Sequence, residues 1–359
     1  MIGSVLSLII LFSVLITVHE FGHFIVAKRN GVKVEKFSIG FGPKIFECKK
    51  GETIYSISLI PFGGFVKMAG EEIEKEKFEE WEYMGKSPGI RMKILFAGSF
   101  NNLIFGFILL IPVFMIGTIT YDGTKIGEFI KNYPAEKSGL KIGDEVIEVN
   151  GEKCKTWIDV TMKIKDSTKK YKEKPINLKV KRGEVFLIFS IKPAPYVIEI
   201  DGKKEVEYII GILPKEKFEK YPFWKAMIKS FKEFYNICAT TIKGLKLLFQ
   251  KRISIKHFTG PVGISEIAVR VWKIGLSSYL QFMAILSINL GIINLIPYPV
   301  LDGGHIFGLF IEKIRRKRPS IKVLQIIQNI GIVTLILFAI YITYQDIDRI
   351  IQINKIKLK

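Results

Sequence analysis

Long apolar stretches, separated by charged segments, dominate the pattern of this chain. The stretches with the length of about 17 to 25 residues that crosses a bilayer core are Ile2–Ala27, Ile94–Thr118, Tyr279–Ile296 and Ile326–Tyr344. The first lacks a basic n-region and a small-residue cleavage site, so we interpret it as a retained helix rather than a signal peptide. The pattern predicts a multi-pass α-helical membrane protein with four transmembrane helices.

The polar segment between the second and third stretches predicts an inserted β-rich domain. A short helix near Pro134 leads to a turn at Gly143-Asp144, and apolar residues then alternate from Val146 to Val149. Asn150-Gly151 follows, which is the strongest short signal for a β-hairpin turn. We expect this compact module to occupy about residues 122–214.

A helical pattern returns from Phe223 to Phe249, with apolar residues at three- and four-residue steps and lysines on the other face. An amphipathic helix with a basic polar face is suited to lying in the membrane interface. The alternative is an ordinary helix that packs on the β-rich module. His257 follows in a turn-rich stretch, and we expect a structural role for it.

Composition and charge narrow the class of protein. Of the 359 residues, 48% are hydrophobic and 25% are charged, and the net charge is +20. The basic residues flank the apolar stretches rather than cover a folded module, which argues against nucleic-acid binding and favours topology control and contact with anionic lipids. Neither a disulfide framework nor a thiolate metal site is expected from the widely spaced cysteines, which are Cys48, Cys154 and Cys238.

The distribution of positive charge predicts the orientation in the membrane. Basic residues are concentrated in residues 28–93 and again in the short segment 306–325. Because cytoplasmic segments carry the excess of lysine and arginine, both segments belong in the cytoplasm. The β-rich domain is then extracytoplasmic, since long segments translocate largely regardless of their charge.

The first apolar stretch ends in a candidate metal motif, His19-Glu20-Phe21-Gly22-His23. Positions i and i+4 lie on one face of an α-helix, so His19 and His23 can aim ring nitrogens at one zinc ion. Glu20 can then act on water as a general base. Ionisable residues at the end of a membrane helix are functional candidates, and the alternative is a pair of interfacial histidines that extend toward lipid headgroups.

A catalytic zinc site with two histidines needs a third protein ligand. The third stretch runs into Asn294–His305, where Pro297 and Pro299 break the helix before Asp302. Non-helical backbone at membrane depth is tolerated where protein or a water-filled cavity surrounds it, as a site that admits water requires. Asp302 is the predicted third ligand, and His305 is its rival.

These motifs and three further runs, in collinear order, resemble the site-2 proteases, specifically the bacterial RseP-type intramembrane zinc metalloproteases. The matching runs are HEFGH at 19–23, FSIGFGP at 37–43, IPFGGFVKMAGE at 60–71, RMKILFAGSFNN at 91–102 and NLIPYPVLDGGH at 294–305. The resemblance implies that Glu20 activates water and that zinc is bound by His19, His23 and Asp302.

The resemblance also implies contacts with substrate. A β-type re-entrant loop in this family presents a strand edge to an unwound substrate, and the residues at the corresponding place are Phe62, Gly63, Gly64 and Phe65. The residues that fall where the family holds substrate near the zinc are Asn294, Pro297 and Pro299.

The β-rich domain is similar to the PDZ domains of bacterial membrane-linked proteases, which can bind peptides by strand addition. It would act as a gate or filter, or alternatively as a spacer. RseP-type proteins often carry two such domains, whereas this chain has room for one. A second departure is Ala97-Gly98-Ser99, where the family usually has Ala-Gly-Pro. We expect this change to alter the start of the second helix without touching a ligand position.

The sequence thus predicts a protease of the bacterial inner membrane that hydrolyses peptide bonds within the bilayer. The implied substrates are single-pass segments whose extracytoplasmic part has been trimmed, such as anti-sigma factors or remnant signal peptides. A membrane-anchored PDZ scaffold with a non-catalytic metal site is one alternative, and a metal transporter is another. Transport would require polar residues at several depths along the spans, whereas here they cluster near one side.

Zinc is the predicted cofactor. The predicted partners are single-pass membrane proteins, membrane lipids and a peptide in the PDZ groove, with no nucleic acid. The predicted segments are a first transmembrane helix with HExxH (1–27), cytoplasmic and membrane-associated β loops (28–93), a second transmembrane helix (94–118), the extracytoplasmic PDZ domain (119–215), an amphipathic helical and turn-rich segment (216–275), a third transmembrane helix with the LDG motif (276–305), a basic cytoplasmic loop (306–325), a fourth transmembrane helix (326–346) and an extracytoplasmic tail (347–359).

Overall fold

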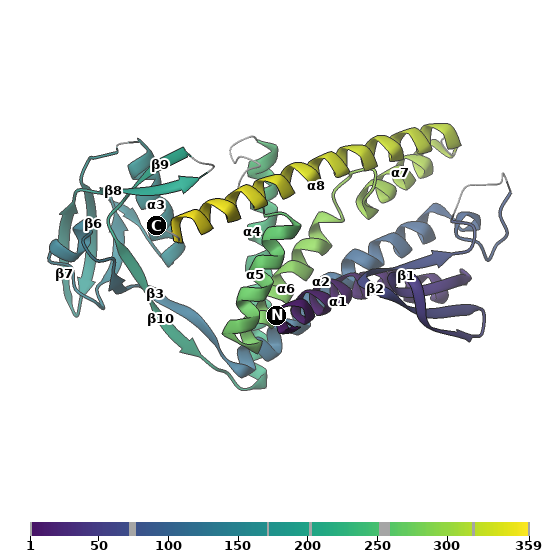
Figure 1. The fold of residues 1–359 in the computed structure, drawn as a ribbon, viewed down its shortest axis with the longest axis horizontal. Helices are drawn as coiled ribbons and strands as arrows, with labels where there is room; N and C mark the ends of the chain where they lie inside the picture. The colour runs from purple at the N-terminus through teal and green to yellow at the C-terminus, as the bar shows by residue number, and fades with distance from the viewer. Residues whose placement is uncertain are drawn as a thin grey trace. The chain divides into compact units, whose positions relative to one another are not determined.

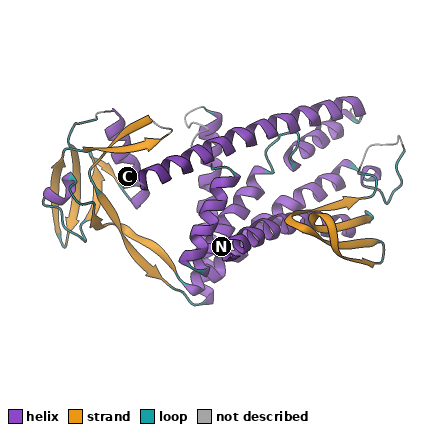
Figure 2. Cartoon of the chain, in the orientation of Figure 1, coloured by secondary structure: helices purple, strands orange, loops and turns teal. Residues whose placement is uncertain are grey.

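The computed structural model describes residues 2–71, 77–170, 172–200, 203–250, 259–317 and 320–357. The chain forms two compact units (Figure 1), one of Met1–Ile116 and Tyr221–Ile347 and the other of Gly117–Lys220 and Asp348–Lys359. The first unit is mainly helical, and strands dominate the second (Figure 2). His257, for which a structural role was predicted, lies outside the described residues.

Long helices build most of the first unit. They are α1 (Ile2–Arg29), α2 (Pro88–Ile116), α4 (Phe223–Phe249), α5 (Pro261–Ile274), α6 (Leu276–Ile293), α7 (Asp302–Arg315) and α8 (Ile321–Lys357). Among the described residues, the helical segments long and apolar enough to cross a membrane are Val5–Arg29, Pro88–Ile116, Leu276–Ile293 and Lys322–Asp348. Each overlaps one of the apolar stretches, so the fold fits the predicted helical membrane protein with an inserted β-rich domain.

The third apolar stretch does not form one continuous helix with the LDG motif. α6 ends at Ile293, and Asp302 begins the separate helix α7. Pro297 and Pro299 lie between them, where each lacks the backbone N–H that a continuing helix needs. Residues 306–325 are therefore partly helical rather than a simple loop, because they contain most of α7 and the start of α8.

Two further boundaries differ from the predicted segments. α2 begins at Pro88 rather than near Ile94, because proline suits the first turn of a helix and the charged Arg91 is buried among neighbours. α8 continues to Lys357, so the predicted tail 347–359 is helical over most of its length.

α4 packs against α2 and α6 through a narrow face. Its residues Phe234 and Cys238 contact the buried side chains of Leu110 and Ile288. The aromatic residues of α4 divide between two environments, since Phe234 also contacts Phe107 of α2 whereas Trp224 is 69% exposed. α4 therefore joins the helical unit while its wider apolar face stays open.

A long antiparallel hairpin, β1 (Val34–Lys50) and β2 (Thr53–Met68), follows α1. Register shifts fold both strands back on themselves, so that Phe37 pairs with Tyr55 on one side and with Val66 on the other. Among the described strands, the last segment of β2 pairs on one side only. This arrangement leaves an open strand edge. A 3-10 turn, Tyr83–Gly85, packs against the start of β1 and the end of β2.

The second unit contains a six-stranded sheet in the order β10-β3-β4-β6-β7, with β5 beside β4, and a separate β8-β9 hairpin. Apolar residues of the sheet pack on α3 around Val146, Trp157 and Leu178. Asn150 and Gly151, both with positive φ, form the predicted two-residue turn between β4 and β5. The elements are β3 (Thr118–Phe129), a 3-10 turn (Pro134–Lys137), β4 (Glu145–Val149), β5 (Glu152–Lys153), α3 (Trp157–Lys170), β6 (Ile176–Arg182), β7 (Val185–Ile191), β8 (Ala194–Ile200), β9 (Lys203–Ile209) and β10 (Ile212–Glu219).

Candidate metal centre

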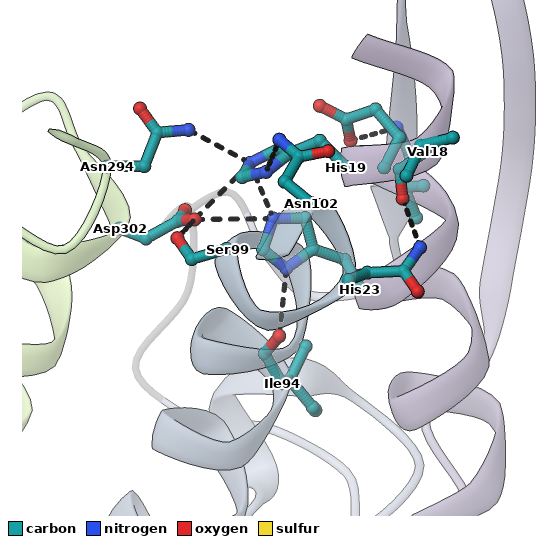
Figure 3. A network of polar contacts seen from close by, with 11 residues as sticks. Val18, His19, His23, Ile94, Ser99, Asn102, Asn294 and Asp302 are labelled. Atoms are coloured by element: carbon teal, nitrogen blue, oxygen red, sulfur yellow. Dashed lines mark hydrogen bonds and ion pairs between the residues drawn. The ribbon is translucent and has the colours of Figure 1, made fainter. Parts of the chain in front are cut away.

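The two histidines of the HExxH motif lie together near the end of α1 (Figure 3). Both are buried, with exposed fractions of 8% for His19 and 7% for His23. Their Nε2 atoms are 3.2 Å apart. The spacing of one helical turn therefore aims both ring nitrogens at one place, as the sequence predicted.

Asp302 reaches the same place from the first turn of α7. Its Oδ2 lies 3.3 Å from Nε2 of His19 and 3.7 Å from Nε2 of His23. The turn that carries it is tight, because a Cβ at Gly303 would come within 2.3 Å of the Leu295 backbone. Only glycine fits that approach, so the Leu-Asp-Gly sequence helps to fix where Asp302 lies.

α1 and α2 approach each other closely behind the histidines. A Cβ at Gly22 would come within 2.3 Å of the carbonyl oxygen of Ala97, and a Cβ at Gly98 within 2.3 Å of Nε2 of His23. Small residues allow membrane helices to pack with their backbones close together. The two glycines thus make room for the imidazoles between the helices.

The clustered side chains fit a zinc ion by donor type and by spacing. Two imidazole nitrogens and one carboxylate oxygen lie within 4.8 Å of one another. Ligands at the usual zinc distances of about 2.0–2.2 Å in a tetrahedral site are roughly 3.3–3.5 Å apart, which is close to the separations in this cluster. Two histidines and one carboxylate are also a ligand set of catalytic zinc sites, which keep one position for water or substrate.

Two residues of α2, Ile94 and Ser99, contact His23 and Asp302 respectively (Figure 3). Nδ1 of His23 lies 2.8 Å from the carbonyl oxygen of Ile94. Since that oxygen can only accept, Nδ1 carries the proton, and the lone pair of Nε2 is free for a metal. The hydroxyl of Ser99 donates a hydrogen bond to Oδ2 of Asp302 at 3.2 Å.

The contact at Ser99 gives the departure from Ala-Gly-Pro a role that was not expected. Ser99 is not one of the clustered side chains, but it contacts one of them, Asp302. Ser99 follows Gly98, where α2 comes closest to the histidines, and the start of α7 packs on the same part of α2. A side chain at this crossing therefore meets the carboxylate of Asp302.

Asn102 of α2 lies beside His19, the other histidine of the cluster. Its Nδ2 lies 3.4 Å from Nδ1 of His19, and its Oδ1 is buried with no hydrogen-bond partner among the described residues. A half-turn of the amide brings the oxygen to Nδ1, where it can accept a proton from the ring. His19 would then present its unprotonated Nε2 to a metal, as ligating histidines with an outer acceptor do.

Glu20 contacts the β-hairpin and is not one of the clustered side chains found among the described residues. The backbone N–H of Val66 donates a hydrogen bond to Oε2 of Glu20 at 3.2 Å. Earlier along α1, the hydroxyl of Ser13 donates a hydrogen bond to the carbonyl oxygen of Pro61. The end of β2 thus runs alongside α1 and brings its open edge next to Glu20.

The predicted substrate-binding residues lie in two places. Asn294 reaches the cluster, with Nδ2 3.4 Å from Nε2 of His19, and Pro297 and Pro299 lie in the segment between α6 and α7. His305, the rival ligand, lies on α7 and is not part of the cluster found among the described residues. The backbone of β2 contains the other predicted residues, Phe62, Gly63, Gly64 and Phe65.

The contacts that sequence reasoning missed are those of Ser99, Asn102 and the Val66 N–H. The first two belong to the run Ala97–Asn102, which is unusually small and polar for an apolar helix. Such positions in a membrane helix mark faces that pack on other helices. The run signalled an inward face, but not which ligand each side chain would meet.

Comparison with known proteins decides the family. A model of Peptidase family M50 matches residues 7–338, which include all the clustered side chains. The chain belongs to peptidase family M50. Its resemblance to the site-2 proteases, first seen in its motifs, is confirmed by this match.

Relatives of this M50 protein are similar over nearly their whole length. The Clostridium perfringens protein CPE1693 is 34% identical over 337 residues, which cover 94% of this chain and 96% of the relative. The regulator of sigma-W protease RasP of Bacillus subtilis is 28% identical, over 97% of this chain and 99% of the relative. The zinc metalloprotease RasP of Bacillus licheniformis is 27% identical over the same shares. The M50 protein is therefore a zinc metalloprotease, and the names of its relatives imply zinc as the metal.

Proposed function

We propose that this M50 protein cleaves single-pass membrane segments inside the bilayer, after their extracytoplasmic part has been trimmed. The observation that carries the proposal is the buried cluster of His19, His23 and Asp302, held by helices of which two are long and apolar enough to cross a membrane. A hydrolytic site enclosed by such helices serves substrates that are themselves in the membrane.

The residues of the cluster divide the chemistry between them. His19, His23 and Asp302 would hold zinc, which when bound would supply Lewis-acid polarisation of the scissile carbonyl and of a water molecule. Glu20 accepts a proton from the attacking water and delivers it to the leaving amine. Asn294, whose amide lies beside Nε2 of His19, holds the substrate backbone at the same place.

The open edge of β2 supports capture of an unwound substrate. Carbonyl groups inside a helix are already hydrogen-bonded, so a substrate helix must unwind before water can attack it. The edge that carries Val66 lies next to Glu20 and is paired on one side only among the described strands. An extended peptide can add to such an edge through its backbone. The residues assigned to this contact are Phe62, Gly63, Gly64 and Phe65.

Pro297 and Pro299 have a different part in the proposal. They keep the backbone between α6 and α7 irregular, and irregular backbone at membrane depth requires surrounding protein or water. Water that reaches this segment also reaches Asp302 at its end. The two prolines thereby leave room for both water and substrate near the ligands.

Charge and similarity indicate orientation and substrate class. The basic segments 28–93 and 306–325 belong in the cytoplasm, which places the β-rich domain outside the bacterial inner membrane. A relative is named as a regulator of sigma-W protease. By similarity, the substrates of this chain are membrane proteins of the anti-sigma factor type or remnant signal peptides.

The β-rich domain serves as a PDZ-type gate or filter in this proposal. A cavity of about 460 Å³ is lined by Trp157 and Ile164 of α3 and by Tyr208 and Ile210 near the end of β9. Among the described strands β10 lies at one end of the sheet order, so a peptide could add to its outer edge. This groove supports peptide binding rather than a role as a mere spacer.

Glu20→Gln tests the proposal directly. The variant should keep stoichiometric zinc, because Glu20 is not in the ligand cluster, and should lose at least about 10²-fold in cleavage. The measurement is cleavage of a model single-pass substrate by purified protein in detergent, with zinc content determined in the same samples. Glu266→Gln, at an ion pair on the surface of α5, is the matched control and should cut at the wild-type rate.

Two outcomes would contradict the proposal. Near wild-type cleavage by Glu20→Gln would remove its role as the base, and wild-type cleavage that resists a chelator would remove the metal. A protein that holds zinc but cuts no membrane substrate would instead favour the PDZ scaffold. Natural substrates follow from mass spectrometry of membrane fragments that accumulate with the wild type and not with Glu20→Gln.

A further inference from the structure

We propose that Ser99 and Asn102, which lie one helical turn apart in α2, are positioning residues for two of the metal ligands. Ser99 positions Asp302, and Asn102 positions His19. The inference rests on the zinc site proposed above and goes beyond it, because neither residue belongs to the HExxH or LDG motif. The two side chains contact different ligands from neighbouring positions of the same helix.

Ser99 selects the oxygen that Asp302 presents. Oδ2 of Asp302 accepts the hydrogen bond from Ser99 and is also the oxygen nearest to both Nε2 atoms. Ser99 is fully buried, and a Cβ at Gly291 of α6 would come within 2.8 Å of its carbonyl oxygen. The hydroxyl is therefore enclosed at a helix crossing, away from water, and holds the carboxylate in one orientation.

Asn102 selects the nitrogen that His19 presents. A neutral imidazole binds metal through Nε2 when Nδ1 carries the proton, and that proton needs an acceptor. The buried Oδ1 of Asn102, which has no partner among the described residues, is the acceptor available after a half-turn of the amide. The hydroxyl of Ser287 donates to the carbonyl oxygen of Asn102 at 2.8 Å and holds this part of α2 in place.

The carbonyl oxygen of Ile94 completes the set, because it already fixes the ring of His23. Each of the three ligands is then oriented by α2, a helix that contributes no ligand itself. Outer partners of this kind typically change metal affinity by about 10–100-fold when removed. Ser99 and Asn102 are the two partners that substitution can remove, since the third is a backbone group.

The test compares Ser99→Ala and Asn102→Leu with two controls in the full-length protein in detergent. Asn102→Asp keeps an acceptor for Nδ1 of His19, and Ser230→Ala removes a buried hydroxyl that bonds within α4. The zinc dissociation constant is measured by competition with a chromogenic chelator, and the melting temperature is measured on the zinc-free protein.

Ser99→Ala and Asn102→Leu should each bind zinc about 10–100-fold more weakly, while Asn102→Asp and Ser230→Ala stay close to the wild type. Zinc-free melting temperatures should change no more than in Ser230→Ala. Unchanged zinc affinity in Ser99→Ala and Asn102→Leu, or a loss that only follows a fall in zinc-free stability, overturns the positioning role. A wild-type protein that binds no zinc overturns the proposed zinc site as well, so the two failures are distinguishable.

Discussion

α2 and α8 are both long and apolar enough to cross a bilayer, yet the protein uses them differently. Of the apolar window of each helix, 33% is buried within the protein in α2 and 6% in α8. α2 turns small and polar residues inward, among them Gly98, Ser99, Asn102 and Gly106. α8 is exposed at large apolar residues such as Ile330, Val333, Ile336 and Leu337. The length of an apolar run therefore predicts a membrane helix, whereas its small and polar residues predict which face packs on other helices and where functional residues lie.

The contacts of the two helices differ in the same way. α2 packs along its length on α1, α4, α6 and α7. Hydrogen bonds connect α8 to other described parts of the first unit at two places. The hydroxyl of Tyr298 bonds to the carbonyl oxygen of Gly331 at 2.9 Å and to the hydroxyl of Thr334, and the N–H of Gly263 donates to Oδ2 of Asp346 at 2.8 Å. We expect substitutions on the inward face of α2 to reach the metal centre and those at α8 to leave it unchanged.

Gly98→Ala should have the largest effect on the metal centre. The added methyl group would overlap Nε2 of His23, since a Cβ there would be 2.3 Å away. We expect zinc affinity to fall by at least about 10²-fold, because the imidazole cannot keep its orientation among packed helices. Competition with a chelator measures the loss. Gly308→Ala on α7 is the matched control, because a Cβ at Gly308 meets nothing within 4 Å. Equal zinc affinity in the two variants would contradict the close approach of α1 and α2.

Arg91→Met should have the next largest effect, on stability. Arg91 of α2 is 2% exposed and pairs with Glu312 of α7, the helix that begins with Asp302. Breaking a buried ion pair by removing one partner costs about 3–5 kcal/mol. Denaturant unfolding of the protein in detergent should show this loss. Arg270→Met removes the partner of Glu266 in an exposed pair and should cost about 0–1 kcal/mol. Similar losses of stability in the two variants would mean that the buried pair between α2 and α7 stabilises the protein no more than the exposed pair in α5 does.

The sequence predicted those features that depend on local pattern. Apolar runs located the helices, the i, i+4 spacing of His19 and His23 placed two nitrogens together, and Asn150-Gly151 located a hairpin turn. The rivalry between Asp302 and His305 could not be settled by periodicity, because both follow the same broken segment. In the structure Asp302 lies in the cluster with His19 and His23, and His305 does not. The tight turn at Gly303, which depends on close contact with the preceding residues Leu295 and Ile296, carries Asp302 there.

Features that depend on the crossing of distant segments were not predicted. Ser99 meets Asp302 across 203 positions of sequence, and no local pattern specifies such a pair. The paired halves of β1 and β2 arise from register shifts that alternation along one strand does not reveal. α7 was mistaken for a loop because its basic residues, which signal orientation, do not report whether the backbone is helical.

Tyr298→Phe should have the smallest effect and tests the α8 side of the comparison. The hydroxyl of Tyr298 contacts both the carbonyl oxygen of Gly331 and the hydroxyl of Thr334. Its loss should cost about 0.5–1.5 kcal/mol and should speed amide hydrogen exchange in α8 near Gly331, measured by mass spectrometry. Tyr344→Phe, at a position 68% exposed, should leave exchange unchanged.

The decisive readout for Tyr298→Phe is zinc affinity, because Tyr298 lies in the segment that leads to Asp302. If the contacts of Tyr298 with α8 do not hold the turn before Asp302, their loss leaves the ligands in place, and zinc binding stays within about twofold of the wild type, a free-energy change below about 0.4 kcal/mol. A loss comparable to that of Gly98→Ala would show that α8 holds the turn before Asp302 in position. Both α2 and α8 would then position the metal ligands, a role that the burial of its residues otherwise indicates for α2 alone.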